Sequence, residues 1–451
     1  MFLHGFQKSM QQLRVPNRSP ALRPPTRCTR PRLPAVKAQQ SVEQQKPQQQ
    51  QGLYAFDGEQ PQEEDMRDCP VFVDRQGEFV RVMCADYGYR SGVGRMYHSA
   101  DGSIPVSGFE LAWDNFRAEL ASLRRSMRGD EYAGVSRRNP PQSLLGKALS
   151  ALGGLAVQGF AALDRTLEGA KLLPKLEAAP ESPDVIDPNT GEVNSECRKI
   201  RQKLQQLTLS NKAVAEREHT RERSGGKVET TWYIRLLYDA VCLMLDVVYN
   251  NRPLQRFWFL ETVARMPYFS YISCIHLYET LGWWRAAAEL RKIHFAEEWN
   301  ELHHLQIMEA LGGDCMWFDR FLAYHSAIAY YWVLVALYIF SPRLSYNFSE
   351  LLEAHAVDTY SEFVSSNEVL LKSLEPPLVA AQYYRSPDLY MFDEFQTDIK
   401  SEKRTPKCDN LYDVFVNIRD DEAEHVKTMN ACQDAEIMDE IVERREQTRR
   451  V

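Results

Sequence analysis

Acidic residues are missing from the first 42 positions, although the chain of 451 residues carries 62 aspartates and glutamates against 54 lysines and arginines. This leader contains arginine, lysine, serine, threonine and proline, and it lacks the compact apolar core of a secretory signal. An acid-free, arginine-rich leader is typical of an organelle transit peptide, which we predict at 1–42; a disordered basic arm is the alternative. The glutamine-rich stretch at 43–60 predicts a linker.

Paired cysteine motifs are also missing. None of the nine cysteines forms a C-x-x-C pair, so no zinc ribbon or redox pair is indicated, and the odd count fits mostly reduced thiols. The net charge of −8 is mild, and the basic residues concentrate in the leader. We therefore predict no nucleic-acid partner.

Long apolar runs are few. Two stretches, 232–249 and 324–340, are nearly apolar all round, but each is shorter than the ~20 residues needed to span a bilayer. The second carries tyrosines and a tryptophan suited to a membrane interface, and arginines flank both stretches. We predict monotopic attachment, in which the apolar faces of two helices enter one leaflet. Fully buried core helices are the alternative.

The rest of the chain predicts an all-α protein with a less regular N-terminal extension at 61–215. In that extension, Val71–Val73 and Phe79–Val82 favour a small hairpin, and 110–128 and 143–176 have helical spacing. A domain at 216–440 follows, with a loop insertion at 375–408 and a charged tail at 441–451. Apolar periodicity and glycine or proline stops predict its helices at 232–249, 257–280, 286–311, 318–340, 343–364 and 411–432.

Two Glu-x-x-His pairs stand on separate predicted helices. A spacing of three residues places Glu301 and His304 on one helix face, and it does the same for Glu422 and His425. Two further helices each carry one glutamate in an apolar setting. This ligand set is that of ferritin-like di-iron carboxylate bundles, so we predict two iron ions in a four-helix bundle with two additional apolar membrane-surface helices. The predicted ligands are Glu261, Glu301, His304, Glu353, Glu422 and His425.

A single Glu-x-x-His pair is weak, because solvated helix faces produce it by chance. Two pairs with two more glutamates on apolar helices favour metal, since buried carboxylates are costly unless they are paired or metal-bound. The neighbouring His303 points about 100° away from His304 and is predicted to support the site or pack in the core. Packing is the favoured role of His294. Asp420, Asp421 and Glu424 are predicted to be supporting partners or solvated charges.

These motifs resemble the alternative oxidase superfamily, and most closely its plastid branch, the plastid terminal oxidases or plastoquinol oxidases. The resemblance is carried by R-F-W-F-L-E-T-V-A-R-M-P-Y-F from position 256, H-F-A-E-E-W-N-E-L-H-H at 294–304, D-L-Y-M-F-D-E-F-Q-T at 388–397 and N-L-Y-D-V-F-V-N-I-R-D-D-E-A-E-H at 410–425. It covers roughly 230–432 and does not reach 52–215.

The resemblance implies that the same six residues bind iron and that Tyr360 is the redox-active or proton-donating tyrosine beside the metals. It also implies that Arg256, Leu260 and Thr359 line a quinol pocket. The chain reads H-A-V-D-T-Y at 355–360, where the plastid pattern is H-A-F-E-T-Y. The valine in place of an aromatic residue bears on the quinol pocket more than on iron binding.

The implied activity is plastoquinol:oxygen oxidoreduction, in which two quinols are oxidised and dioxygen is reduced to water. The implied location is the chloroplast thylakoid membrane, with a transit peptide for the plastid at 1–42, and we also expect a homo-oligomer. The first alternative is a mitochondrial ubiquinol alternative oxidase of the inner membrane. A di-iron desaturase or hydroxylase is the second, and a non-enzymatic helical scaffold or iron-storage bundle is the third.

Overall fold

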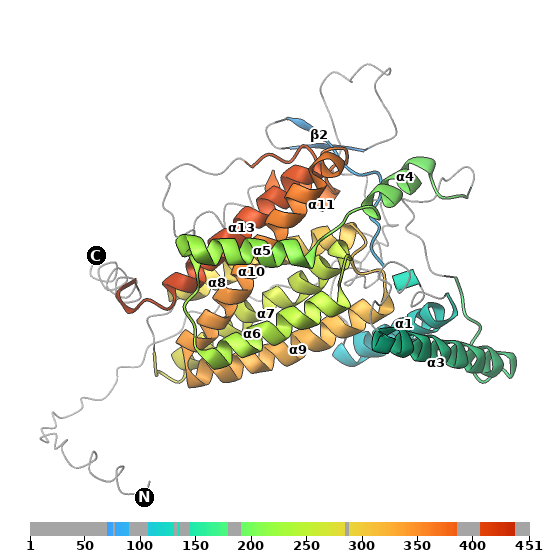
Figure 1. Ribbon diagram of the computed structural model, residues 1–451, viewed down its shortest axis with the longest axis horizontal. Helices are drawn as coiled ribbons and strands as arrows, with labels where there is room; N and C mark the ends of the chain where they lie inside the picture. The colour runs from blue at the N-terminus through green and yellow to red at the C-terminus, as the bar shows by residue number, and fades with distance from the viewer. Residues whose placement is uncertain are drawn as a thin grey trace, which may run out of the picture. The chain divides into compact units, whose positions relative to one another are not determined.

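The computed structural model describes residues 70–74, 77–89, 107–129, 134–135, 144–178, 191–284, 288–385 and 406–437 (Figure 1). These residues belong to one compact unit, Met66–Val451. The predicted leader, linker and charged tail lie outside the described residues, as does the motif at 388–397.

The described chain is almost wholly helical, which confirms the all-α class. Strands β1 (Val71–Val73) and β2 (Phe79–Arg81) form a two-stranded antiparallel hairpin in which Phe72 pairs with Val80. A short π-helical turn at Glu222–Gly226 follows α5. The helices are α1 Gly108–Arg128, α3 Leu144–Gly169, α4 Ser195–Leu204, α5 Asn211–Arg221, α6 Trp232–Val248, α7 Pro253–Thr280, α8 Ala288–Ala310, α9 Trp317–Phe340, α10 Pro342–Leu371, α11 Leu378–Tyr384 and α13 Leu411–Ala431.

The four helices that carry the predicted ligands, α7, α8, α10 and α13, make the predicted bundle. Helix α7 packs along α8, and α10 packs along α13, while α9 covers another side of α7 (Figure 1). Aromatic rings fill the core between these helices: Phe257 stacks on Tyr360 with ring centroids 4.2 Å apart, and Phe363 and Phe415 meet edge to face at 4.7 Å. The bundle therefore has a rigid aromatic end directly beside the residues predicted to bind metal.

Local signals in the sequence set the helix ends. Helix α8 ends at Ala310, and Gly312 adopts a φ of +82°, a left-handed conformation that glycine tolerates best. Ser341 ends α9 and caps α10 by accepting a hydrogen bond from the Leu344 N–H, with Pro342 as the first residue of α10. These stops bring Glu301 and Glu353, on α8 and α10, to the same level of the bundle.

The structure departs from expectation in four places. The region predicted as a loop insertion at 375–408 contains α11, because Pro377 starts a turn whose Val379, Ala380 and Tyr383 are buried. Helix α5 runs across the predicted boundary at 216 and packs on α10. Part of the extension also joins the main core, through buried side chains at Met83, Ala85, Tyr87 and Cys197.

The fourth departure concerns the length of a helix. The apolar run at 324–340 belongs to the 24-residue helix α9, which among the described helices is the one long and apolar enough to cross a membrane by length and composition. Its first turns, however, hold Asp319 and Arg320, which are fully buried. Arg252 pairs with Asp319, and Arg320 bonds to Glu119 of α1 at 2.9 Å. The charged start of α9 is thus part of the protein interior.

Candidate metal centre

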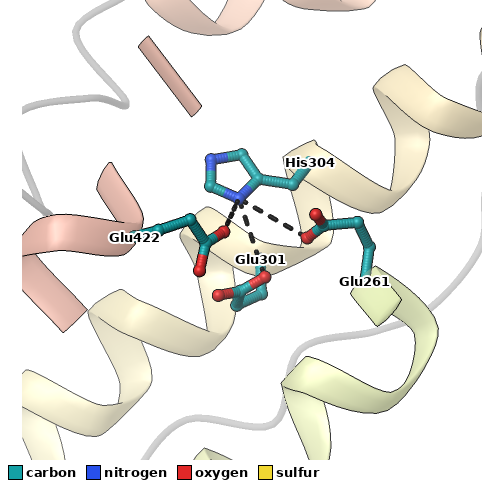
Figure 2. A group of neighbouring side chains, drawn as sticks. All are labelled: Glu261, Glu301, His304 and Glu422. Atoms are coloured by element: carbon teal, nitrogen blue, oxygen red, sulfur yellow. Dashed lines mark ion pairs between the residues drawn. The ribbon is translucent and has the colours of Figure 1, made fainter. Parts of the chain in front are cut away.

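The six predicted ligands converge at the centre of the bundle. Their donor atoms fall into two groups, and within each group the atoms lie within 4.8 Å of one another. Glu301 and Glu422 belong to both groups. The first group adds Glu261 and His304, as Figure 2 shows, and the second adds Glu353 and His425. The two groups thus share two carboxylates, and each group adds one further Glu and one His. A two-metal carboxylate site requires this arrangement.

The cluster contains donor atoms that the protein leaves without hydrogen bonds. No described residue makes a hydrogen bond to Glu261 Oε2, Glu301 Oε2 or His304 Nδ1, although all three atoms are buried. In Figure 2, His304 Nδ1 faces Glu261, Glu301 and Glu422, with 3.6, 3.6 and 3.3 Å to their nearest oxygens. Buried polar atoms without partners are costly. Oxygen and imidazole nitrogen donors suit iron, so the residues present fit a pair of iron ions.

The protonation of the cluster reflects its negative charge. Burial, followed by the charges of Glu422 and Glu301, raises the pKa of Glu353 well above its usual range. Burial lowers the pKa of His425, but Glu301 and then Glu422 outweigh it and bring that pKa to about 9. Without metal, the cluster therefore holds protons that cations can displace.

Asp421 supports His304, one of the predicted metal ligands. Its Oδ2 lies 3.1 Å from Nε2 of His304, on the opposite side of the imidazole ring from the metal-facing Nδ1. The same oxygen accepts hydrogen bonds from Asn300 at 3.0 Å and from the Tyr384 hydroxyl at 3.0 Å. Carboxylates in this position fix the ring orientation and the tautomer of a metal-binding histidine. Tyr384 belongs to α11, so that helix helps to hold the site.

Tyr360 lies directly beside the cluster. Its hydroxyl donates a hydrogen bond to Oε1 of Glu261, and its ring is fully buried against Phe257. Burial and the neighbouring charge of Glu261 raise the pKa of Tyr360 well above its usual range. The tyrosine is therefore a neutral O–H donor to a ligand carboxylate.

An apolar cavity of about 70 Å³ adjoins the cluster. Its walls come from α6, α7, α9 and α10, and its inner end reaches Glu261, Glu353 and Glu422. Of the three residues expected to line a quinol pocket, the structure places Leu260 in this wall. Thr359 is buried elsewhere and donates to the His355 carbonyl at 2.8 Å, while Arg256 reaches the cavity through His355.

His355 is one of the polar groups in the cavity wall, beside the hydroxyls of Tyr330 and Ser349 and the three glutamates. Its Nε2 lies 3.1 Å from a guanidinium nitrogen of Arg256, and its Nδ1 lies 3.3 Å from the Tyr238 hydroxyl and 3.5 Å from Glu218. Burial lowers the pKa of His355, but hydrogen bonds to Cys242 and Glu218 raise it to about 9. Arg256 also bonds through Nη1 to Asn211 and Asp246, while its buried Nε makes no hydrogen bond to any described residue.

A second buried polar chain leads away from the centre. The Tyr346 hydroxyl lies 2.9 Å from Nε2 of His294, and Nδ1 of His294 lies 2.9 Å from Glu297. Tyr346 and Tyr338 line an open pocket of about 390 Å³, at the end of the bundle where α9 meets α10. Glu297 stands one helical turn before Glu301. The sequence favoured a packing role for His294, but in the structure both of its ring nitrogens lie next to polar partners.

Several supporting residues were missed or left open by the sequence. The structure separates Asp421, which is buried against His304, from Asp420, which is exposed and pairs with Arg419. Glu424 pairs with Lys427. His303 stacks on Tyr383 with centroids 4.1 Å apart, so it packs beside the site. Tyr268, which donates to Glu353 at 2.9 Å, had no signal in the sequence.

Fold and cluster together define a helical-bundle carboxylate protein with the donor set of a two-metal site. A sequence profile of the alternative oxidases matches residues 205–434, about half of the chain. The chain therefore belongs to the alternative oxidase family, and the match begins earlier than the resemblance read from the motifs.

The most informative relative is a plastid protein. "Ubiquinol oxidase 4, chloroplastic/chromoplastic" of Arabidopsis thaliana is 55% identical over 210 residues, which are 45% of this chain and 60% of that protein. "Ubiquinol oxidase, mitochondrial" of Mangifera indica is 26% identical over 220 residues, 47% of this chain and 61% of that protein. The predicted plastid branch is confirmed by this contrast. The chain spans about 60% of the length of both relatives, and the comparison with solved structures found no match.

Proposed function

We propose that the protein is a quinol:oxygen oxidoreductase that oxidises two quinols and reduces dioxygen to water at two iron ions. The observation that carries this proposal is the buried cluster of four glutamates and two histidines beside an apolar cavity. Glu301 and Glu422 would bridge the two ions, because they alone belong to both donor groups. When bound, ferrous ions would supply electrons to dioxygen.

The chain's own residues would then handle protons. Reduction of dioxygen to water consumes four protons, and oxidation of two quinols releases four. Tyr360 can give its hydroxyl hydrogen toward Glu261, to which it is already hydrogen-bonded. The chain from Tyr346 through His294 to Glu297 offers a route for protons from the open pocket toward the centre. The stacking of Phe257 on Tyr360 excludes water from the part of the cluster next to Tyr360.

Quinol would bind in the apolar cavity, which lies between the ligands and helices α6 and α9. We propose plastoquinol as the quinol, on the similarity to the chloroplastic relative, although the printed name of that protein is ubiquinol oxidase. The cavity wall offers the Tyr330 and Ser349 hydroxyls and the His355 imidazole to a ring oxygen, and Arg256 contacts His355. Leu260 supplies apolar contact.

The same relative supports a plastid location, with residues 1–42 as the import signal. Helices α6 and α9 would attach the enzyme to one leaflet of the thylakoid membrane, so that an apolar quinol enters from the lipid. The outward faces of both helices are largely apolar, with the Arg235–Asp239 pair as an exposed charged pair on α6, and their inward faces share one buried cluster with α10.

Iron content and oxygen uptake test this function together. The purified protein should hold about two irons per chain, as the donor set implies, and should consume oxygen with plastoquinol analogues. Glu422→Gln should lose both properties. The matched control is Asp420→Asn on the same helix, which removes an exposed carboxylate and should change neither. Full oxygen uptake by iron-free protein, or full activity of Glu422→Gln, would refute the proposal.

Two measurements separate the alternatives. Oxygen uptake with plastoquinol and with ubiquinol analogues tests which quinol is the substrate. Import of a fluorescent fusion into isolated plastids and mitochondria tests the proposed location. Iron binding without quinol-dependent oxygen uptake would favour a storage or scaffold role instead.

A further inference from the structure

Residues 82–89 form an extended segment, here called the strap, that follows the hairpin and crosses the main core. The Met83 N–H donates to the Pro376 carbonyl at 2.9 Å, and the Tyr87 N–H donates to the Ala310 carbonyl at the end of α8 at 2.8 Å. The Tyr89 N–H donates a hydrogen bond to Oδ1 of Asp314 at 2.9 Å. Backbone hydrogen bonds thus fix the strap at both ends, and Cys84 lies between them.

Cys84 meets Cys197, 113 residues further along the chain. The two sulfur atoms are 2.8 Å apart. A disulfide bond is about 2.05 Å long, so the sulfurs need to approach by less than about 1 Å to form one. The Tyr87 hydroxyl also donates to the Cys197 carbonyl at 3.0 Å, which holds the strap against this part of α4. The two thiols are therefore pre-aligned by contacts that do not depend on the sulfur atoms.

The surroundings suit thiol–disulfide exchange. Cys84 is partly exposed, whereas Cys197 is buried, so an external thiolate can reach the sulfur of Cys84. Cys197 lies in the first turn of α4, where backbone N–H groups and the helix dipole favour negative charge. The guanidinium of Arg201 lies one turn further along, over the Tyr87 ring at 5.3 Å. A thiolate leaving from Cys197 would meet a positive environment.

We propose that Cys84 and Cys197 are a redox modification site that forms a reversible disulfide with low-molecular-weight or protein disulfides as oxidants and dithiols as reductants. In the forward direction, the Cys84 thiolate attacks the incoming disulfide and releases one thiol. The Cys197 thiolate then displaces the second thiol from Cys84. Two electrons pass from the cysteines to the oxidant, whose two sulfurs leave as thiols with the two protons.

Neither cysteine lies within residues 205–434, so the site is a property of this chain outside the matched family region. The disulfide would close a loop that contains α1 and α3 entirely. In the reduced protein, hydrogen bonds and the buried side chains of Met83, Ala85 and Tyr87 hold the strap on the main core. The redox state would therefore set how firmly the extension is fastened to the oxidase bundle, and it requires neither iron nor quinol.

The test uses full-length purified protein equilibrated in mixtures of reduced and oxidised glutathione, quenched with acid and alkylated with N-ethylmaleimide. Peptide mass spectrometry should find a Cys84–Cys197 cross-link that grows with oxidised glutathione and disappears with dithiothreitol. The oxidised protein should also unfold several degrees higher than the reduced protein. Cys84→Ser should abolish the cross-link and the thermal shift.

Cys315→Ser is the matched control, since the exposed Cys315 thiol touches the strap at the Tyr87 carbonyl but should not be needed. It should keep both the cross-link and the thermal shift. A native protein whose Cys84 and Cys197 both stay alkylatable at every glutathione ratio would overturn the proposal. Pairing seen only in urea, or pairing of Cys84 with another cysteine, would overturn it equally. Because iron content and oxygen uptake are not the readouts, either result leaves the proposed function untouched.

Discussion

Two leucines on the outward face of α6 offer a direct test of membrane attachment. Leu236 and Leu243 stand two helical turns apart, with exposed fractions of 63% and 65%. We predict that the double substitution Leu236→Lys and Leu243→Lys releases the protein from lipid. Both positions lie outside the metal cluster and the cavity wall, so the fold and the iron content should not change.

The magnitude follows from the exposed area. Full burial of a leucine is worth about 1.5–3 kcal/mol, so moving two thirds of each side chain into lipid contributes about 1–2 kcal/mol. The pair thus accounts for about 2–4 kcal/mol, and since 1.4 kcal/mol is a factor of ten, the partition coefficient should fall by at least about 30-fold. Drawing the lysine ammonium groups into the hydrocarbon would add a further cost.

Flotation with uncharged phosphatidylcholine vesicles measures this partition, because new positive charges gain no attraction from neutral lipid. Val369→Lys is the matched control: this valine is 86% exposed but lies near the end of α10, away from α6 and α9. The control should float like the wild type. Equal flotation of the double variant and the wild type would refute attachment through α6, and loss of flotation in the control would point to a nonspecific effect.

Three further predictions concern the site and the extension. Metal-free protein should lose stability as the pH rises from 6.5 to 9, because the pKa of His425 is raised to about 9 and its contribution is complete below the unfolded value of 6.5. The loss is at most about 3 kcal/mol by urea unfolding, and a metal-free protein that is equally stable at both pH values would contradict it. Asp421→Asn should weaken iron retention about 10- to 100-fold in a chelator competition, because His304 loses its supporting carboxylate; unchanged retention would assign Asp421 no such role. Arg124→Ala should loosen α3 from α1 by about 1.5–3 kcal/mol in hydrogen exchange, since the buried 2.7 Å pair with Asp164 is lost while Arg128 still pairs with that carboxylate, whereas unchanged protection of α3 would show that the Arg124–Asp164 pair does not hold the two helices together.

The parts of the site that could be predicted are those set by helical periodicity. Glu301 and His304 share a face because they are three residues apart, and glycine or proline stops mark the ends of their helices. Periodicity cannot rank neighbours of equal chemistry, however. Asp420 and Asp421 differ by one residue, and only the rotation of α13 against α8 makes the second a partner of His304.

The quinol-pocket residues show a second limit. The role of Arg256 in a quinol pocket stays a prediction, and the structure adds that Asn211 and Asp246 accept hydrogen bonds from its guanidinium. Both partners come from segments that pack on α7 only in the folded protein, so no pattern within α7 indicates them. In the same way, α11 is too short for its periodicity to distinguish it from a loop, although Tyr384 reaches the centre of the bundle.

The order of the ligands along the chain has a consequence for how the protein is made. Glu261 is the first ligand, while Glu422 and His425 lie on α13, the last of the described helices. Contacts between such distant segments form late, because long loops must close first. Neither donor group is complete without α13, so the proposed iron site would be complete only when this helix has docked along α10. Iron loading would then report the completion of folding, and a chain truncated before α13 would remain without iron however much iron is supplied.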